Sequence, residues 1–300
     1  MEKKYGEVIP KKRCEFTVLV SSCDAYEDLW NPFFSIIKKE WPEVVDYPIV
    51  LNTESKAYTH DGLNIKCYQL YKPGTKVHWG KRLIDTLNRV EDDYVLFLLD
   101  DFFLTDRVNY AEIVRCYEYM RQDKNIAVFY FIPSSDPNQK RSDKYLGYAK
   151  RSQNGAWKLN TQAALWRKDK LISYIRPHES AWEWEVYGSQ RSSRYLEDFY
   201  AVCSRENRAF QYRDDWGGAI HRGRWTPYAI DLLKKNGFAI DVSIRGIEDE
   251  APPYGIPKNE QNMNRIQRMF RPPFLKRLKA YVIYLLSRPR EWIVKYKSLK

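Results

Sequence analysis

Two acidic residues follow the most apolar segment of the chain. Residues 94–99 (YVLFLL) are typical of a buried strand, and Asp100 and Asp101 come directly after it. Adjacent carboxylates repel each other unless a proton or a cation offsets their charge. Mg²⁺ and Mn²⁺ take oxygen ligands, commonly one or two carboxylates together with substrate phosphates. The pair therefore predicts a divalent metal site for a diphosphate ligand, with Asp101 and Asp100 as ligands. A helix N-cap and a solvated loop are the structural alternative.

A second polar break lies earlier in the chain. The run Ser21-Ser22-Cys23-Asp24 follows an apolar segment at residues 16–21, and Asn52 follows another at residues 47–51. In open α/β sheets, ligands bind beyond the carboxyl ends of the strands. We therefore expect these polar residues to lie near Asp100 and Asp101.

Two other aspartate chemistries do not fit. Aspartyl-phosphate phosphatases place a second Asp two residues after the nucleophile, and Phe102 occupies that position after Asp100. Response-regulator domains also use paired acids, but they are much shorter than this chain.

The elements that must position these groups follow from hydrophobic periodicity. Strands are expected at residues 16–21, 47–51, 65–70, 94–99, 126–132, 161–167 and 239–244, with short pieces near Phe210 and at 218–221. Helices are expected at residues 24–41, 77–90, 107–121, 168–175, 181–205 and 227–235. Alternating strands and helices predict an α/β fold with a mainly parallel sheet flanked by helices.

Composition limits the class of protein. The chain has 300 residues, of which 44% are hydrophobic and 30% charged, which is typical of a globular protein. Five cysteines without a CxxC pair favour a reducing compartment. No apolar run approaches the ~18 residues of a membrane span, and the start MEKKYGEVIPKKRCEF lacks the apolar core of a signal peptide. We therefore expect a cytoplasmic protein.

The positive charge is concentrated at one end. The net charge is +11, and residues 258–300 hold twelve Lys or Arg against two acids. The preceding residues are almost neutral, which argues against nucleic acid as a partner. An apolar stripe at helical spacing runs through residues 274–286, flanked by Lys276, Arg277 and Lys279. Such a segment can lie on an anionic membrane surface; the alternative is a helix packed on the body.

These features predict a division of the chain. Residues 1–245 would form the α/β domain, residues 246–262 a linker that contains Pro252, Pro253 and Pro257, and residues 263–300 a basic amphipathic helical tail. With such a tail the protein would be peripheral on the cytoplasmic face of the membrane.

The order of segments resembles a known family, the nucleotide-sugar glycosyltransferases of the GT-A fold, especially bacterial enzymes of surface polysaccharide (capsule and lipopolysaccharide) synthesis. TVLVSSCDAYED looks like the nucleotide-binding first strand, and HWGKRLIDTLNRVEDDYVLFLLDDFFL like the helix, strand and Asp-containing metal motif. LNTQAALWRKDKL and ESAWEWEVYGS resemble the acceptor-side strand and the acidic segment. The likeness covers residues 15–245. The family motif is commonly Asp-x-Asp, whereas this chain has Asp-Asp-Phe-Phe, so a one-carboxylate or metal-independent site is the alternative.

The resemblance implies roles for the donor-side residues. Ser21, Asp24 and Asn52 would contact the nucleoside of a nucleotide-sugar donor, with UDP favoured by the resemblance alone. Asp101, helped by Asp100, would hold Mn²⁺ or Mg²⁺ across the diphosphate. From the residue types alone, His221 in WGGAIHRGRW is a candidate to reach the diphosphate or the metal, and Arg222 or Arg224 to neutralise the leaving group; a structural histidine is the alternative.

Glycosyl transfer also needs a base for the acceptor hydroxyl. Residues two apart on a helix point to different sides, so only one of Glu183 and Glu185 can face the site. Glu185 is preferred, with Trp182 three residues earlier, because a carboxylate beside an indole is partly desolvated and more basic. A solvated acidic helix start is the alternative. Trp182, Trp184 and Trp216 are candidates for stacking on an acceptor saccharide.

The sequence thus predicts an inverting, metal-dependent glycosyltransferase that acts on a saccharide or lipid-linked acceptor. Two other functions remain open. One is a non-catalytic relative that binds nucleotide or carbohydrate. The other is a nucleotidyltransferase, although that class carries a Gly- and Arg-rich loop after its first strand, and SSCDAYEDLW contains neither residue.

Overall fold

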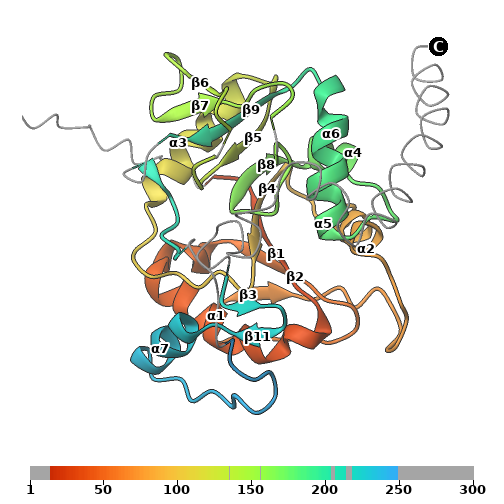
Figure 1. The fold of residues 1–300 in the computed structure, drawn as a ribbon, viewed down its shortest axis with the longest axis vertical. Helices are drawn as coiled ribbons and strands as arrows, with labels where there is room; N and C mark the ends of the chain where they lie inside the picture. The colour runs from red at the N-terminus through yellow and green to blue at the C-terminus, as the bar shows by residue number, and fades with distance from the viewer. Residues whose placement is uncertain (1–13, 135, 156, 204–206, 214–217, 249–300) are drawn as a thin grey trace, which may run out of the picture. The chain divides into compact units, whose positions relative to one another are not determined.

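The computed structural model describes residues 14–248, apart from 135, 156, 204–206 and 214–217. Its main sheet has the strand order β3-β2-β1-β4-β8-β5-β9-β7-β6 (Figure 1). These strands are β1 (Thr17–Ser21), β2 (Pro48–Asn52), β3 (Asn64–Lys66), β4 (Tyr94–Leu99), β5 (Ile126–Tyr130), β6 (Lys140–Arg141), β7 (Tyr148–Lys150), β8 (Ala164–Arg167) and β9 (Asp198–Val202). A small hairpin pairs β10 (Ile220–His221) with β11 (Arg224–Trp225).

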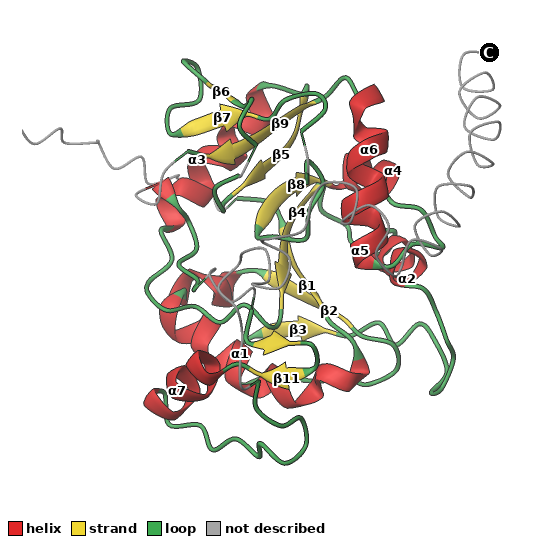
Figure 2. Cartoon of the chain, in the orientation of Figure 1, coloured by secondary structure: helices red, strands yellow, loops and turns green. Residues whose placement is uncertain are grey.

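Helices cover both faces of the main sheet (Figure 2). The longer ones are α1 (Glu27–Glu40), α2 (Trp79–Leu87), α3 (Tyr110–Gln122), α4 (Lys168–Tyr174) and α7 (Pro227–Lys235). A continuous helical run consists of α5 (Ala181–Glu183), the π-helical turn η3 (Trp184–Gly188), α6 (Ser189–Arg191) and the 3₁₀ turn η4 (Ser192–Arg194). Two further 3₁₀ turns are η1 (Asp24–Tyr26) and η2 (Pro42–Asp46).

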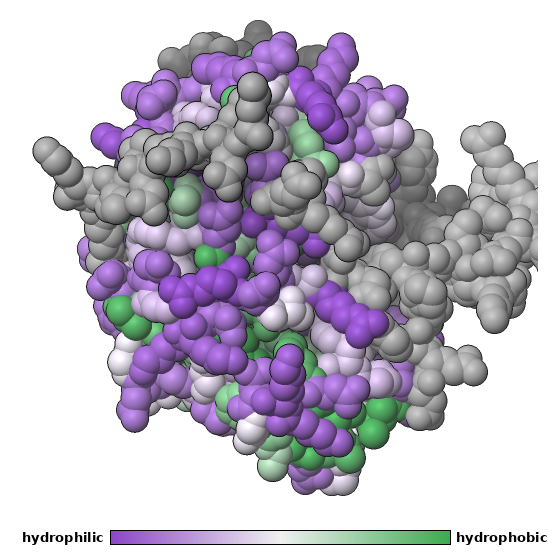
Figure 3. Space-filling view, turned by 90° about the vertical axis from the view of Figure 1, so that its left-hand side faces the viewer, coloured by the Kyte–Doolittle hydropathy of each residue, from purple (hydrophilic) through white to green (hydrophobic). Residues whose placement is uncertain are grey.

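Alternation along the strands divides the core into two layers. On β1, Val18 and Val20 face the layer built with α1, α3 and α7, and Leu19 faces the layer built with α2, α4 and η3. β4 alternates in the same way, because successive side chains of a strand point to opposite faces. The helices turn polar sides outward, and the face that carries α1, α3 and α7 is mostly hydrophilic, with hydrophobic residues gathered toward its lower end (Figure 3).

The expectation of a mainly parallel sheet is wrong, because the sheet is mixed. β1, β2, β3 and β4 pair in parallel, as do β5 and β9. β8, however, lies between β4 and β5 and is antiparallel to both, and β7 is antiparallel to β9 and β6. Strand direction depends on partners far away in sequence, so local periodicity could not reveal it.

Most expected elements are present, with three errors. The strand at residues 94–99 and the helix at 227–235 have the expected bounds. The helix expected at 181–205 ends at Arg194, and residues 198–202 form β9. The strand expected at 239–244 is absent, and the strand expected at 65–70 ends at Lys66.

The predicted tail lies outside the described residues, as does most of the predicted linker. Residues 246–248 are described, and they pair with β11: the amide of Trp225 donates to the carbonyl of Gly246 at 3.1 Å. Within residues 14–248, no helix is long and apolar enough to cross a bilayer.

Candidate active site

The ends of three parallel strands bring the predicted donor-side residues to one edge of the sheet. In the observed register, Ser21 lies opposite both Asn52 of β2 and Leu99 of β4. Ser21, Asn52 and the Asp100-Asp101 pair therefore lie on adjacent strands at the same edge, as expected for parallel strands.

Asp100 is buried at this edge and held by a neighbour that sequence reasoning did not single out. Its side chain is 3% exposed and accepts a short hydrogen bond from the hydroxyl of Ser22. The indole of Trp30 on α1 donates in turn to Ser22 Oγ at 2.7 Å. Burial raises the pKa of Asp100 well above its ordinary value, and the charge of Asp101 raises it further.

Asp101 is half-buried and lies against the segment that leads into β10. The Asp101 carbonyl accepts the amide of Ala219 at 2.5 Å, and Gly218 packs on the carboxylate. A Cβ on Gly218 would lie 2.8 Å from Asp101 Oδ2, and its φ of +118° also favours glycine. Burial raises the pKa of Asp101 to about 7.

Asp100 and Asp101 could supply part of the coordination shell of a divalent cation, and other molecules would have to supply the rest. Among the described residues, no group of three or more His, Cys, Asp or Glu side chains gathers in a metal-binding arrangement. Asp100 and Asp101 could therefore supply two carboxylates, and a diphosphate and water would complete the shell. A divalent ion would also offset the repulsion that raises the pKa of Asp100.

Three other donor-side candidates are engaged within the protein. The Asp24 carboxylate accepts amides of the loop after β2, from Glu54 at 3.0 Å and Lys56 at 3.2 Å, and the Ser55 hydroxyl at 2.6 Å. Burial would raise its pKa, but these hydrogen bonds outweigh burial and lower it. Asp24 thus ties the ends of β1 and β2 together.

Ser21 and Asn52 face α2. Ser21 Oγ accepts the indole N–H of Trp79 at 3.1 Å, and Asn52 Oδ1 accepts the Thr86 hydroxyl at 2.9 Å. Asn52 Nδ2 is buried and makes no hydrogen bond to the described residues, so it remains available as a donor.

Arg82 is a buried cation that sequence reasoning missed. It lies on α2, is 4% exposed, forms an ion pair with Glu54 and donates to the Ser22 carbonyl at 2.8 Å. The position of Arg82 in the sequence could have revealed it. Trp79, Arg82 and Thr86 are three and four residues apart, so they lie on one side of a helix. Trp79 and Thr86 on this side contact Ser21 and Asn52, so a cation there faces the ends of β1 and β2.

Glu185 lies at the same edge of the sheet. Glu185 Oε1 accepts the amide and the hydroxyl of Thr161, each at 2.7 Å. Thr161 precedes β8, which pairs antiparallel with β4 so that Ala164 lies opposite Phe97. Residues just before Ala164 therefore lie at the edge where β4 ends. Burial raises the pKa of Glu185, although the bonds from Thr161 oppose the rise.

Glu183 has a different, local role. It is exposed, and its Oε2 accepts the amide of Ser180 at 2.8 Å while Ser180 Oγ accepts the Glu183 amide at 3.2 Å. This reciprocal pair is a capping box at the start of α5.

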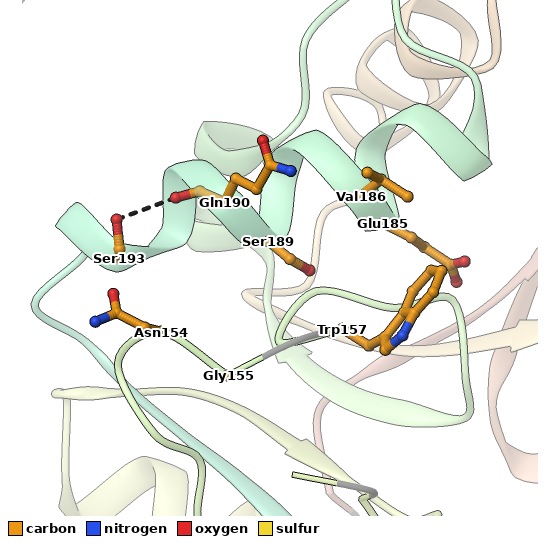
Figure 4. Close-up of a pocket in the computed structure, with 8 residues that line it drawn as sticks. All are labelled: Asn154, Gly155, Trp157, Glu185, Val186, Ser189, Gln190 and Ser193. Atoms are coloured by element: carbon orange, nitrogen blue, oxygen red, sulfur yellow. Dashed lines mark hydrogen bonds between the residues drawn. The ribbon is translucent and has the colours of Figure 1, made fainter. Parts of the chain in front are cut away.

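Glu185 borders a pocket of about 510 Å³ (Figure 4). Trp157 lines the same pocket, and Figure 4 draws its ring and the Glu185 carboxylate toward the same end. Trp157 was not predicted, because its exposure depends on how its loop folds. Of the three predicted stacking rings, Trp184 is buried against Trp79 and Trp166 and cannot stack on a ligand, Trp182 is 70% exposed, and Trp216 lies outside the described residues.

His221 and Arg222 lie on the β10–β11 hairpin. His221 Nδ1 is 3.7 Å from Glu248 Oε2, and Arg222 is exposed at a turn in which it and Gly223 have positive φ. This two-residue turn suits the twist of a hairpin. The hairpin begins beside Asp101 through Gly218 and Ala219, but no hydrogen bond or ion pair among the described residues joins His221 or Arg222 to the carboxylate pair.

No protein-family model matches the chain, and no curated protein matches it by sequence. Solved structures that match the chain in part include TarS of S. aureus, at 14% identity, with a TM-score of 0.44, over 66% of this chain and 60% of that one. The mannosyltransferase PcManGT of Pyrobaculum calidifontis, in complex with GDP-Man and Mn²⁺, matches at 12% identity and a TM-score of 0.45, over 71% and 59%. An active-site mutant of LgtC matches at 11% identity and a TM-score of 0.46, over 77% and 99%.

The chain therefore covers less than two thirds of the length of the TarS and PcManGT chains that it resembles.

Proposed function

We propose that this protein is a glycosyltransferase that moves a sugar from a nucleoside-diphosphate donor to a saccharide or lipid-linked acceptor. The observation that carries the proposal is the shared edge of the sheet. A buried carboxylate pair, Asp100 and Asp101, ends β4 beside the polar ends of β1 and β2, and a partly buried carboxylate, Glu185, is held beside the start of the neighbouring β8.

The donor would occupy the ends of β1, β2 and β4. Asp101, which is the more exposed of the pair, would contact Mn²⁺ or Mg²⁺ first, and the metal would stabilise the charge of the departing diphosphate. Asp100, held by Ser22, would orient that contact. The unpaired Nδ2 of Asn52 is a donor for the nucleoside, which we take to be uridine from the resemblance of the first strand.

The acceptor would approach from the side of Glu185. Its Oε1 is engaged by Thr161, which fixes the carboxylate, and no hydrogen bond of the described residues uses Oε2. A fixed carboxylate with a pKa raised by burial suits removal of the acceptor proton near neutral pH. A base on the acceptor side favours a single displacement with inversion.

The basic segment near the end of the sequence is the basis for a proposed cellular setting. We propose that the basic segment at residues 263–300 holds the protein on the anionic cytoplasmic face of a membrane, where lipid-linked acceptors for surface polysaccharides are found. A cytoplasmic, peripheral location is part of the same proposal.

Calorimetric titration with UDP, GDP, CDP and dTDP, each with and without Mn²⁺, tests the donor side. Binding of one nucleotide that needs Mn²⁺ in the native protein and is lost in Asp101→Ala supports the proposal. Binding without metal would remove the role of Asp101. Failure of all four nucleotides to bind would favour the non-catalytic alternative.

A further inference from the structure

The pocket beside Glu185 has two walls that are joined at several points. One wall is formed by Asn154, Gly155 and Trp157, and the other by the helical run from Glu185 to Ser193. The Leu159 amide donates to Ser189 Oγ at 2.9 Å, and the Ser189 hydroxyl donates back to the Leu159 carbonyl at 3.0 Å.

Further hydrogen bonds connect the loop segment and the helical run at both ends of the pocket. Gln153 Nε2 donates to the carbonyls of Ser193 and Tyr195, each at 2.7 Å, and Thr161 holds Glu185 at the other end. The pocket is therefore built before any ligand arrives.

The loop wall is also anchored from beneath. Buried Asp136 accepts the amide and the hydroxyl of Ser152, each at 2.8 Å, and lies 3.7 Å from the buried Arg151. Gly155 packs so closely on Asp136 that a Cβ there would lie 2.6 Å from Oδ2. These contacts fix the path of the loop that presents Trp157.

The backbone of Trp157 has an unusual conformation. Its φ is +56°, in the left-handed region that non-glycine residues rarely occupy, and its carbonyl accepts Asn160 Nδ2 at 3.1 Å. The ring is 44% exposed rather than packed in the core. It lines the pocket together with Glu185 (Figure 4). Strain at an exposed aromatic residue is typical of ligand sites.

The lining has the chemistry that recognises an uncharged sugar. The apolar face of a pyranose can stack on the indole of Trp157, and its hydroxyl groups can donate to Glu185 Oε2. Asn154 and Gln190 also line the pocket, and the structure shows no hydrogen bond from either side-chain amide to a described residue. The volume of about 510 Å³ falls in the range of small-molecule sites.

The same lining disfavours anions. The described lining residues include one carboxylate and no Lys, Arg or His. Lys158 is close in sequence, but it is 1% exposed and its Nζ lies 3.4 Å from the carbonyl of Ser192 and 4.6 Å from the ring of Phe199. It is therefore not available at the pocket surface.

We infer that this pocket binds one uncharged pyranose unit of the acceptor, stacked on Trp157 and hydrogen-bonded to Glu185. The inference rests on the proposed function for the identity of the ligand as acceptor. Trp157 is then a residue that determines specificity, because it selects a sugar with an apolar face and the pocket rejects acidic sugars.

The test is saturation-transfer NMR of the full chain with methyl glycosides of glucose, galactose and N-acetylglucosamine, and with methyl glucuronide. We expect at least one neutral glycoside to bind and the glucuronide to fail at pH 7.5. Trp157→Ala should weaken binding of the neutral glycoside roughly tenfold, and Trp157→Phe should retain part of it. Trp182→Ala is the matched control, because Trp182 is exposed but does not line the pocket.

The outcomes distinguish a failure of this inference from a failure of the proposed function. Absence of glycoside binding in the native chain, equal binding of the glucuronide, or equal losses in Trp157→Ala and Trp182→Ala would overturn the inference. Unchanged Mn²⁺-dependent nucleotide binding in Trp157→Ala is expected, and its loss would assign the pocket to the donor instead. Glycoside binding in a chain that binds no nucleotide would contradict the proposed function and leave the sugar site standing.

Discussion

At the scale of single residues, the Asp100-Asp101 pair combines burial with repulsion. Asp100 is 3% exposed, and burial raises the pKa of both carboxyl groups. An acid whose pKa is higher in the folded chain than in the unfolded chain binds its proton more tightly when folded. Stability therefore decreases as the pH rises from about 4 to about 7, because over this range only the folded chain keeps the proton. A bound cation would stabilise the ionised carboxylates, so that stability would instead increase as the pH rises over this range.

Asp101→Asn should therefore stabilise the metal-free protein while it abolishes function. At pH 8 we expect the free energy of unfolding to rise by about 2 kcal/mol, and the gain to shrink toward pH 4. Urea unfolding at several pH values measures the first effect, and Mn²⁺-dependent nucleotide binding, which should be lost, measures the second. A variant that is destabilised at pH 8 would show that Asp101 has a structural role instead.

Glu183 and Glu185 should separate stability from turnover. Glu183→Ala removes the capping box with Ser180 and should lower the free energy of unfolding by about 0.5–1 kcal/mol, with turnover little changed. Glu185→Gln should lower turnover at least a hundredfold while nucleotide binding is retained, because the amide cannot accept the acceptor proton. Steady-state kinetics and thermal melting of both variants check this. Lost turnover in Glu183→Ala, with Glu185→Gln active, would assign the base to Glu183.

At the scale of elements, the site is built from segments that hold one another. Asp24 ties the end of β1 to the loop after β2, and Arg82 of α2 reaches the same loop through Glu54. The segment after α7 is tied in the same way. Arg245 donates to Asp28 of α1 at 2.5 and 2.7 Å and to the carbonyl of Ala25 at 2.6 Å.

Arg245 also stacks over Tyr26, with 4.7 Å between the guanidinium carbon and the ring centroid. Burial raises the pKa of Tyr26 to about 12, and the charge of Asp101 adds to the rise. Arg245 thus ties the segment after α7 to η1 and α1, which follow the end of β1 where we propose that the donor binds.

Arg245→Ala should remove the contacts that hold the segment after α7 on η1 and α1. We expect a loss of about 1–2 kcal/mol in stability, faster proteolysis between residues 238 and 248, and weaker nucleotide binding. Arg245→Lys should recover little, because a lysine cannot make the forked contact to Asp28. Limited proteolysis and calorimetry measure both effects. Unaltered proteolysis in Arg245→Ala would show that other contacts fix the segment.

At the scale of the whole molecule, charge separates the two ends of the chain. Residues 258–300 carry nearly all of the net positive charge. Each basic group near an anionic membrane surface contributes about 1 kcal/mol to binding, and the effect is weakened by salt.

Charge reversal in the tail should release the protein from membranes. The triple variant Lys276→Glu, Arg277→Glu and Lys279→Glu should reduce sedimentation with phosphatidylserine vesicles at least tenfold, with no change in melting temperature. The matched control reverses Lys66, Lys72 and Lys76, which are exposed on the body. Equal losses in both variants would indicate a general charge effect, and persistent binding of the tail variant would refute the membrane role.

The extent to which the site could be predicted differs from residue to residue. Asp100 and Asp101 were found because an apolar strand followed by two acids is a local pattern. Ser22 was passed over for Ser21, since only the pleat of β1 shows which serine faces Asp100. Trp157 was missed because its exposure depends on contacts with a helical run about thirty residues later.

By itself, the sequence determined where most helices and strands lie, that a carboxylate pair follows the most apolar strand, and that the basic charge lies at one end. These three features depend on patterns among residues that are close together in the sequence. Only the tertiary structure decided that β8 runs antiparallel between β4 and β5, that residues 198–202 form a strand, and that Glu185 shares a pocket with Trp157. Hydrogen bonding between strands and packing between distant segments decide these features, and neither leaves a local signal in the chain.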